Sequence, residues 1–190
     1  MVYIGVIGAG ECDEKTALLA YEVGKEIALS GAILVCGGRG GVMEAACRGC
    51  KDFGGVSLGI LPGRKRQEAN PFVSYVLATG MGEMRNFLVV RCSDVLIAIS
   101  GKYGTLSEIA IALKEGKSVF ALQPFLQWPD PGEHPQDQPQ GPSPRLGSVT
   151  QDQPQSSSPR LVPPLQWPDL EVVFSPQEAV KRALSCCEPT

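Results

Sequence analysis

Short apolar, β-branched runs alternate with longer amphipathic stretches along the first 122 residues of the 190-residue chain. The apolar runs predict strands at residues 2–7, 32–36, 56–61, 73–77, 95–99 and 118–122, and a short one at 172–174. The amphipathic stretches predict helices at about residues 13–30, 42–53, 83–92 and 106–115. Alternation of this kind is typical of βαβ units, whose strands run parallel. We therefore expect an α/β chain with a three-layer Rossmann-like fold, in which a mostly parallel central sheet of about six to seven strands carries helices on both faces.

Capping residues specify the starts of two helices. Asp13 is a good N-cap for the first helix, and Gly31 suits its end. Before the final helix, Ser175 can serve as N-cap, with Pro176 at the first helical position and Glu178 at the third. These signals predict helix ends that the apolar pattern alone leaves open.

A proline-rich segment in the second half of the chain repeats itself. QDQPQGPSPRL at 136–146 recurs as QDQPQSSSPRL at 151–161, and LQWPD at 126–130 recurs at 165–169. Removing one 39-residue period leaves 151 residues, an ordinary domain length. We therefore expect a single Rossmann-like domain over 1–190, with 126–164 as a proline-rich duplicated loop insert, and we expect Trp167 to pack better than Trp128. A proline-recognition ligand is the alternative, which the lack of a regular PxxP series disfavours.

Composition excludes several classes of function. The net charge is −3 and the only basic run is Arg64-Lys65-Arg66, so we expect no nucleic-acid partner. No apolar stretch approaches the length of a membrane span, and the apolar start lacks a basic region, so we expect a cytoplasmic chain without a membrane partner. The single histidine, His134, excludes Ser-His-Asp triads and multi-histidine metal sites.

The seven cysteines predict neither a disulfide framework nor a metal site. Their number is odd, and most of them fall in or beside predicted core elements, as reduced thiols do (Cys12, Cys36, Cys47, Cys50 and Cys92). Cys47 and Cys50 form a lone CxxC without a second pair of ligands, which favours buried thiols over zinc or redox chemistry.

Two glycine-rich loops follow the first two strands, at the edge of a parallel sheet where ligands bind. Gly8 and Gly10 supply half of a dinucleotide fingerprint, but Asp13 stands where its third glycine should be. A tight turn and an anion site explain this loop equally well. Residues 37–41 (GGRGG) hold four glycines, including Gly37, Gly38 and Gly41. The close approach of a ligand to the backbone would explain all four glycines, whereas a tight turn with positive φ angles would explain about two of them. Arg39 either pairs with a phosphate or points to solvent.

A third loop, SGKYGTLSE at 100–108, leads from the fifth strand into a helix. It is not a Walker A loop, because the Gly-Lys-Ser/Thr ending is absent. The backbone at Gly101 and Gly104, the Lys102 ammonium and the Thr105 hydroxyl would still suit a phosphate at the positive end of the helix dipole. Thr105 and Glu108 also fit a capping box, so a structural and a catalytic role for Glu108 remain equal alternatives.

Three ordered motifs resemble a known family. GGRGGVME at 37–44, MRN at 84–86 and GKYGTLSE at 101–108 are similar to motifs of the LOG (lonely guy) nucleoside 5′-monophosphate phosphoribohydrolases. The YGTLSEIA signature resembles more closely the bacterial branch akin to molybdenum cofactor carrier proteins. The resemblance covers about residues 1–122 and resumes at 172–184. It implies a Rossmann-like domain that assembles as a homodimer or homotetramer.

The resemblance also implies roles for individual residues. LOG enzymes carry a PGGxGTxxE motif whose glycines and Thr hold the 5′-phosphate, and whose Glu acts with an upstream Arg at the N-glycosidic bond. The matching positions are Gly101, Gly104, Thr105, Glu108 and Arg85. Ser100 replaces the proline of the motif, and Lys102 replaces its second glycine. These differences weaken the case for hydrolysis more than the case for phosphate binding, because Lys102 adds a positive charge where a phosphate would bind.

Two functions therefore stand side by side, both with a small phosphorylated ligand. In the first, Arg85 and Glu108 are catalytic and a nucleoside monophosphate is cleaved to base and ribose 5-phosphate. In the second, the same loops hold a molybdopterin-type pterin phosphate, or a nucleotide for sensing, and no bond breaks. No resident cofactor is expected in either case. Lysine decarboxylase activity is rejected, because the chain shows neither a persuasive pyridoxal-phosphate lysine nor a partner histidine.

Overall fold

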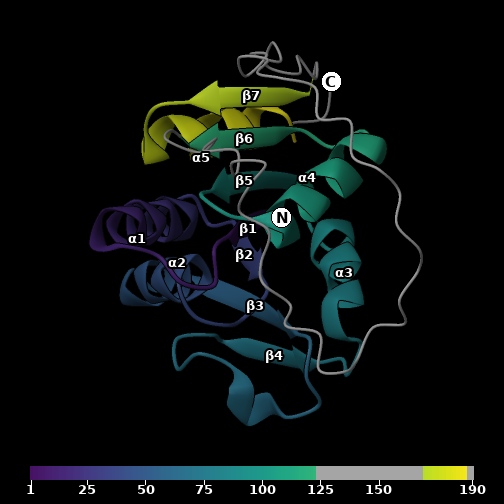
Figure 1. Cartoon of the computed structure of the whole chain (residues 1–190). Coiled ribbons are helices and arrows are strands. Elements are labelled where there is room, and N and C mark those ends of the chain that lie inside the picture. Colours follow the sequence, from purple (N-terminus) through teal and green to yellow (C-terminus); the bar gives the residue numbers. More distant parts are fainter. Residues whose placement is uncertain (123–168, 188–190) are drawn as a thin grey trace, which may run out of the picture. The chain divides into compact units, whose positions relative to one another are not determined.

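The computed structural model describes residues 1–122 and 169–187, and Figure 1 shows their arrangement. Seven parallel strands form one sheet in the order β4-β3-β2-β1-β5-β6-β7. The strands are β1 (Tyr3–Gly8), β2 (Ile33–Cys36), β3 (Val56–Leu61), β4 (Tyr75–Ala78), β5 (Val95–Ile99), β6 (Val119–Leu122) and β7 (Leu170–Val173). The expected α/β class is confirmed, and the sheet is wholly rather than mostly parallel.

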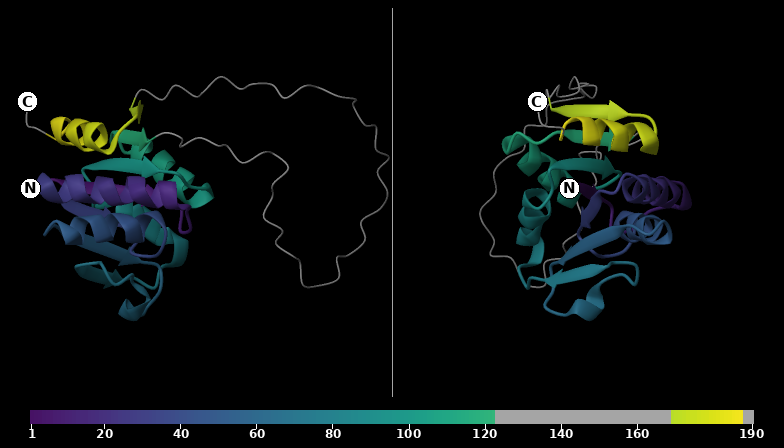
Figure 2. Two further views of the ribbon diagram at one scale, coloured as in Figure 1. Left: turned by 90° about the vertical axis from the view of Figure 1, so that its left-hand side faces the viewer. Right: turned by 180° about the vertical axis from the view of Figure 1, so that it is seen from behind.

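Helices cover both faces of this sheet, as Figures 1 and 2 show. α1 (Glu14–Leu29), α2 (Val42–Asp52) and α5 (Pro176–Ser185) lie on one face, and α3 (Arg85–Arg91) and α4 (Tyr103–Lys114) on the other. Two 3-10 turns, η1 (Arg66–Glu68) and η2 (Gly82–Met84), stand in the loops that follow β3 and β4. This is the expected three-layer arrangement.

The core consists of two apolar layers, one on each side of the sheet. Ile97 in β5 packs with residues of α1, α2 and α5, whereas its neighbours Leu96 and Ala98 pack with residues of α3 and α4. Every residue of β5 is buried. A strand covered on both faces has no polar side to its sequence, which is why the VLIAI run is uninterrupted.

Both capped helix starts form as predicted. Asp13 Oδ1 accepts a hydrogen bond of 2.8 Å from the Thr16 N–H, and Gly31 follows α1 with a φ of 74°. Ser175 Oγ accepts from the Glu178 N–H at 3.2 Å, and the Glu178 carboxylate accepts from the Phe174 N–H. Each cap satisfies backbone donors that have no partner within the helix.

Several element boundaries differ from the prediction by one to three residues. β4 begins at Tyr75 instead of residue 73, because the Asn70 side chain accepts from the Phe72 N–H and holds residues 70–73 in a turn. α4 begins at Tyr103 instead of residue 106. β7 spans Leu170–Val173, two residues before the predicted start, because it pairs with β6 from Leu170 onward.

The sheet order reverses beside β1, since β2 lies on one side of it and β5 on the other. Loops that leave β1 and β5 therefore diverge to opposite faces and open a crevice at the carboxyl edge, where ligands bind in folds of this type. No helix in the described ranges is long and apolar enough to cross a membrane. The predicted insert at 126–164, Trp128, Trp167 and His134 lie outside the described residues.

Candidate functional site

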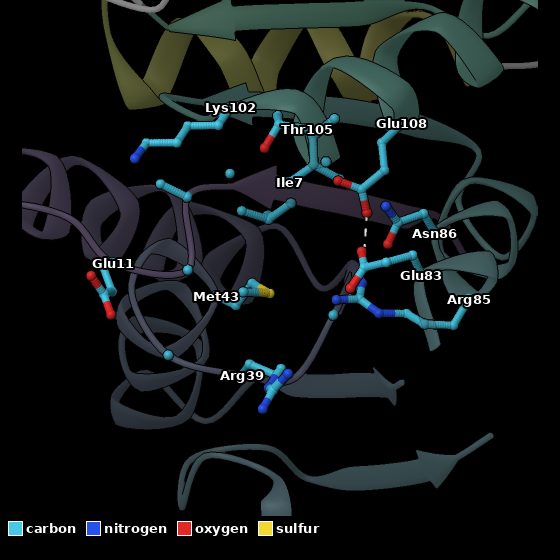
Figure 3. A pocket seen from close by; sticks show the side chains of 17 residues that line it. Ile7, Glu11, Arg39, Met43, Glu83, Arg85, Asn86, Lys102, Thr105 and Glu108 are labelled. Carbon is cyan, nitrogen blue, oxygen red and sulfur yellow. Dashed lines mark ion pairs between the residues drawn. The ribbon is translucent and has the colours of Figure 1, made fainter. Parts of the chain in front are cut away.

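A cavity of about 570 Å³ lies at the carboxyl edge of the sheet, at the reversal beside β1. Its walls come from the ends of β1 and β2, the start of α3 with its preceding turn η2, and the start of α4, as Figure 3 shows. Such a volume lies within the range of small-molecule sites. Its lining residues are Val6, Ile7, Gly8, Ala9, Gly10, Glu11, Gly37, Arg39, Gly40, Met43, Glu83, Arg85, Asn86, Lys102, Gly104, Thr105 and Glu108.

A buried ion pair forms the inner wall of this cavity. Arg85 Nη1 lies 3.6 Å from Glu108 Oε1, and the two residues are only 7% and 6% exposed. The guanidinium rests against the backbone of Gly37, where an added Cβ atom would collide with both of its terminal nitrogens. Arg85 Nε is buried and has no hydrogen-bond partner among residues 1–122 and 169–187. The arginine is thus fixed in place while part of its donor capacity is unused.

The Glu108 carboxyl titrates near neutrality. Burial raises its pKa to about 7, the Arg85 cation beside it opposes that rise, and the negative charge of Glu83 adds to it. Desolvation is the largest of the three effects, because a carboxylate loses its hydration inside the protein. A group with such a pKa can accept or release a proton at physiological pH.

The start of α4 forms an opposite, electropositive wall. Lys102 is the N-cap residue, and no side chain in the described part of the protein caps this helix end, so its first backbone N–H groups are available to a ligand. Thr105 lies in the first turn, with its side chain against Gly101, and Glu108 lies one turn further along. The capping-box explanation for these two residues is therefore wrong, because Thr105 is inside the helix and is not its N-cap.

The backbone before α4 has an unusual conformation. Ser100, which follows β5, has a φ of 52° and is the one residue other than glycine with a positive φ in residues 1–122 and 169–187. The adjacent Gly101 has a φ of 145°. Non-glycine residues adopt such angles only where the surrounding structure enforces them, and they concentrate at functional sites.

Asn86 links the two helices that bound the site. Its Nδ2 donates to Ser107 Oγ at 3.3 Å, and Ser107 Oγ donates to the Gly104 carbonyl at 2.7 Å. This chain holds the start of α3, which carries Arg85, against the start of α4. The relative position of the two charged walls is thereby determined by hydrogen bonds.

Most of the predicted site residues meet in the cavity. Those that line it are Gly8, Gly10, Gly37, Arg85, Lys102, Gly104, Thr105 and Glu108. Gly38, Gly41 and Gly101 lie behind the lining and shape its loops. Gly41 has a φ of 62° and lets its loop cross that of Gly10. Gly38 also has a positive φ, so positive φ accounts for two of the four glycines, as predicted, and the Arg85 guanidinium accounts for Gly37.

Several lining residues were not among the predicted site residues. Arg39 lines the cavity and is exposed, so both roles left open for it, pairing with a phosphate and pointing to solvent, remain predictions. Met43 and Asn86 stand inside motifs that carry the family resemblance, so their positions could have been inferred. Glu11 and Glu83 are exposed acidic residues in loops, and no spacing distinguishes them from other surface carboxylates.

The cysteines lie outside this cavity and are all free thiols. Cys36, Cys47 and Cys50 are buried, as predicted, and Cys12 is partly buried. Cys92 lies beside α3 but is exposed, so the expectation that it is a buried thiol is wrong. Within the described ranges, no group of three or more His, Cys, Asp or Glu side chains is placed to hold a metal ion.

Comparison with known proteins identifies the family. The model of the SLOG cluster4 family matches residues 1–154. The chain belongs to the SLOG cluster4 family. An uncharacterized protein of Archaeoglobus fulgidus is 55% identical to this SLOG cluster4 protein over 124 residues, which make up 65% of this chain and 82% of the relative.

Two solved structures resemble this SLOG cluster4 protein. The molybdenum cofactor binding protein from Rippkaea orientalis is 43% identical, with a TM-score of 0.63 over 64% of this chain and 76% of the other. The molybdenum cofactor carrier protein from Chlamydomonas reinhardtii is 29% identical, with a TM-score of 0.69 over 97% of this chain and 98% of the other. The resemblance inferred from the YGTLSEIA signature is thus confirmed.

Proposed function

We propose that this SLOG cluster4 protein binds a phosphorylated pterin of the molybdenum cofactor type and releases it unchanged. The observation that carries the proposal is the 43% identity with the Rippkaea orientalis protein, which is described as binding that cofactor. The cavity supports it by its volume of about 570 Å³ and by its position at the carboxyl edge of the sheet. Hydrolysis, the first of the two functions that the sequence indicates, becomes the second candidate.

The electropositive wall would hold the phosphate of the ligand. The uncapped start of α4 offers backbone N–H groups, and Lys102 at the N-cap adds a full positive charge. A phosphate at a helix N-terminus is stabilised by both the free N–H groups and the helix dipole. Lys102 is exposed at the cavity rim, so it can close over a bound phosphate without a conformational change in the sheet.

Anaerobic titration with isolated molybdenum cofactor tests the proposal. We expect saturable binding to the wild-type protein and a loss of affinity of about tenfold in Lys102→Gln, as one charge-assisted hydrogen bond to phosphate predicts. Lys114→Gln is the matched control, because Lys114 lies in the last turn of the same helix and is exposed. No binding by the wild-type protein would refute the carrier function, and equal losses in both variants would refute the phosphate position.

A second candidate function, hydrolysis of nucleoside 5′-monophosphates, is favoured by the Arg85–Glu108 pair. Glu108 is buried, has a pKa of about 7 and is oriented by a cation, as a general base for water requires. Its carboxylate would also stabilise the positive charge that develops on the ribose. Release of free base from AMP or GMP, absent in Glu108→Gln, would establish this activity. Binding of the nucleotide without release of free base would exclude hydrolysis and support the carrier function only.

We also propose that the protein forms a homodimer or homotetramer in the cytoplasm. Apolar side chains are exposed at the starts of α3 and α4, where Met84, Phe87 and Tyr103 are 73%, 41% and 53% accessible. Exposed apolar groups clustered near a site are typical of association surfaces. Light scattering of the purified protein should give a mass of two or four chains, and a monomer at micromolar concentration would refute this.

A further inference from the structure

The inner wall of the cavity carries one carboxylate more than its single arginine can neutralise. Arg85 is paired with Glu108, and Glu83 forms no ion pair with any residue in the described ranges. Figure 3 shows the Glu83 carboxylate, which comes from η2, pointing toward Arg85 and Glu108. The three side chains together have a net charge of −1 when both acids are ionised.

The opposite wall has the reverse character. The Lys102 cation lines this wall of the cavity, and the uncapped start of α4 adds a positive dipole end. A ligand that fills the cavity therefore meets an electropositive wall at the start of α4, which suits an anion, and an inner wall with carboxylates, which suits hydrogen-bond donors. Glu83 has no structural task that would compete with a ligand, because it is exposed on a three-residue turn.

The chemical pattern of the inner wall is a donor beside acceptors. The Arg85 guanidinium can donate, and the carboxylates of Glu83 and Glu108 can accept. An aminopyrimidinone ring presents the complementary edge, with a carbonyl oxygen, a ring N–H and an amino group side by side. Pterins and guanine share this edge, whereas adenine has an unprotonated ring nitrogen that a carboxylate would repel.

We propose that Glu83 is a specificity-determining residue that accepts hydrogen bonds from the ring N–H and amino groups of an aminopyrimidinone ligand, while Arg85 donates to the ring carbonyl. The inference rests on the proposed function, since the ligand's phosphate must occupy the start of α4 for its ring to face Glu83. Glu83 would thus select ligands that carry an aminopyrimidinone ring. An analogue without the amino group loses a charge-assisted hydrogen bond to the Glu83 carboxylate, which favours the ring that carries this donor.

Calorimetric titration with GMP and IMP tests the proposal, because IMP lacks only the 2-amino group. We expect GMP to bind about tenfold or more tightly than IMP to the wild-type protein. In Glu83→Gln the two affinities should converge to within about twofold, because the amide presents one acceptor atom in place of two. Glu11→Gln is the matched control, since Glu11 is another exposed carboxylate of the cavity that is not part of the Arg85 cluster.

The outcomes separate this inference from the proposed function. Equal binding of GMP and IMP by the wild-type protein, or discrimination that survives in Glu83→Gln, overturns the role of Glu83. Binding of molybdenum cofactor without binding of GMP overturns the ring-edge inference and leaves the carrier function standing. If neither the cofactor nor any nucleotide binds, both proposals fail together.

Discussion

Arg85 and Glu108 form a pair whose two charges are buried but only loosely joined. Their 3.6 Å separation and the unpartnered Arg85 Nε leave each charge incompletely compensated. Burial of charge without full pairing costs stability, and such costs are retained where the groups act on a ligand. The geometry of the pair is therefore more typical of a ligand-binding site than of an ion pair that stabilises the fold.

Replacement of Gly37 by alanine should disturb this pair directly. The new Cβ would collide with the Arg85 guanidinium and move it from Glu108. Because the Arg85 cation lowers the pKa of Glu108, its displacement should raise that pKa above about 7. Carbon-detected NMR titration of the Glu108 carboxyl measures the change. Gly10→Ala is the control, since an added Cβ there has no neighbour within 4 Å, and an unchanged pKa in Gly37→Ala would contradict the prediction.

Glu108 should also make stability depend on pH. Its pKa in the folded protein is about 7, above the ordinary value of 4.5, so the folded state binds the proton more tightly than the unfolded state. This contribution is fully present below about pH 4.5 and is lost as pH rises to about 7, at about 1.4 kcal/mol per unit, or roughly 3 kcal/mol in all.

Glu108→Gln should remove that dependence and make the protein more stable than wild type at pH 8. Urea unfolding of both proteins between pH 5 and 8 measures it. Glu83→Gln serves as a comparison, because removal of its negative charge should lower the pKa of Glu108 and shift the loss of stability to lower pH. Parallel pH profiles for wild type and Glu108→Gln would show that Glu108 does not titrate in this range.

At the scale of elements, the site depends on how short helix α3 is held. Its seven residues are too few to be stable alone, and its end is fixed by Lys117, from the turn before β6. Lys117 Nζ donates to the carbonyls of Val90 at 2.8 Å, Arg91 at 3.3 Å and Ser93. A cation at a helix C-terminus pairs with carbonyls that have no partner in the helix and with the negative dipole end.

Lys117→Met should therefore destabilise the protein by about 1 to 3 kcal/mol, the range for charge-assisted hydrogen bonds to buried acceptors. Denaturant unfolding measures the loss, with Lys114→Met as the matched control, because Lys114 is exposed. Equal stability of the two variants would mean that solvent replaces the ammonium at these carbonyls without cost.

The sequence predicts the elements better than it predicts the site. Apolar runs such as 95–99 define strands because burial on both faces excludes polar residues. The sequence predicts the start of α4 three residues late, because Tyr103 and Gly104 have weak helix propensity. The hydrogen bond from the Leu106 N–H to the Lys102 carbonyl nevertheless forms the first turn. Glu83 could not be predicted, since its role arises only when η2 places it beside Arg85.

At the scale of the whole molecule, the connection between β6 and β7 is the part of the chain that contains the repeated segment. β6 ends at Leu122 and β7 begins at Leu170, and the two strands pair in parallel. Without one 39-residue repeat, eight residues would join them. Eight extended residues span about 26 Å, whereas the connection must cover only the length of a four-residue strand, roughly 13 Å, to lead back to the start of the parallel β7. Eight residues are therefore enough to join β6 to β7.

Deletion of residues 126–164 should thus leave the fold and ligand binding intact. Shortening the connection lowers the entropy cost of closing it by roughly 1.5 kcal/mol, so the Tm should be unchanged or a few degrees higher. Differential scanning calorimetry of the full chain and the deletion variant makes the comparison. A Tm lower by 10 °C or more would show that the segment stabilises the domain.

The positive φ of Ser100 has a consequence for how this loop relates to the PGGxGTxxE loop of the LOG enzymes. A proline ring holds φ near −65°, about 120° from the angle that Ser100 adopts. A proline at position 100 would therefore require the loop before α4 to take a different backbone path. Ser100→Pro should thus disturb the position of Lys102 and the start of α4, although the substituted side chain is small.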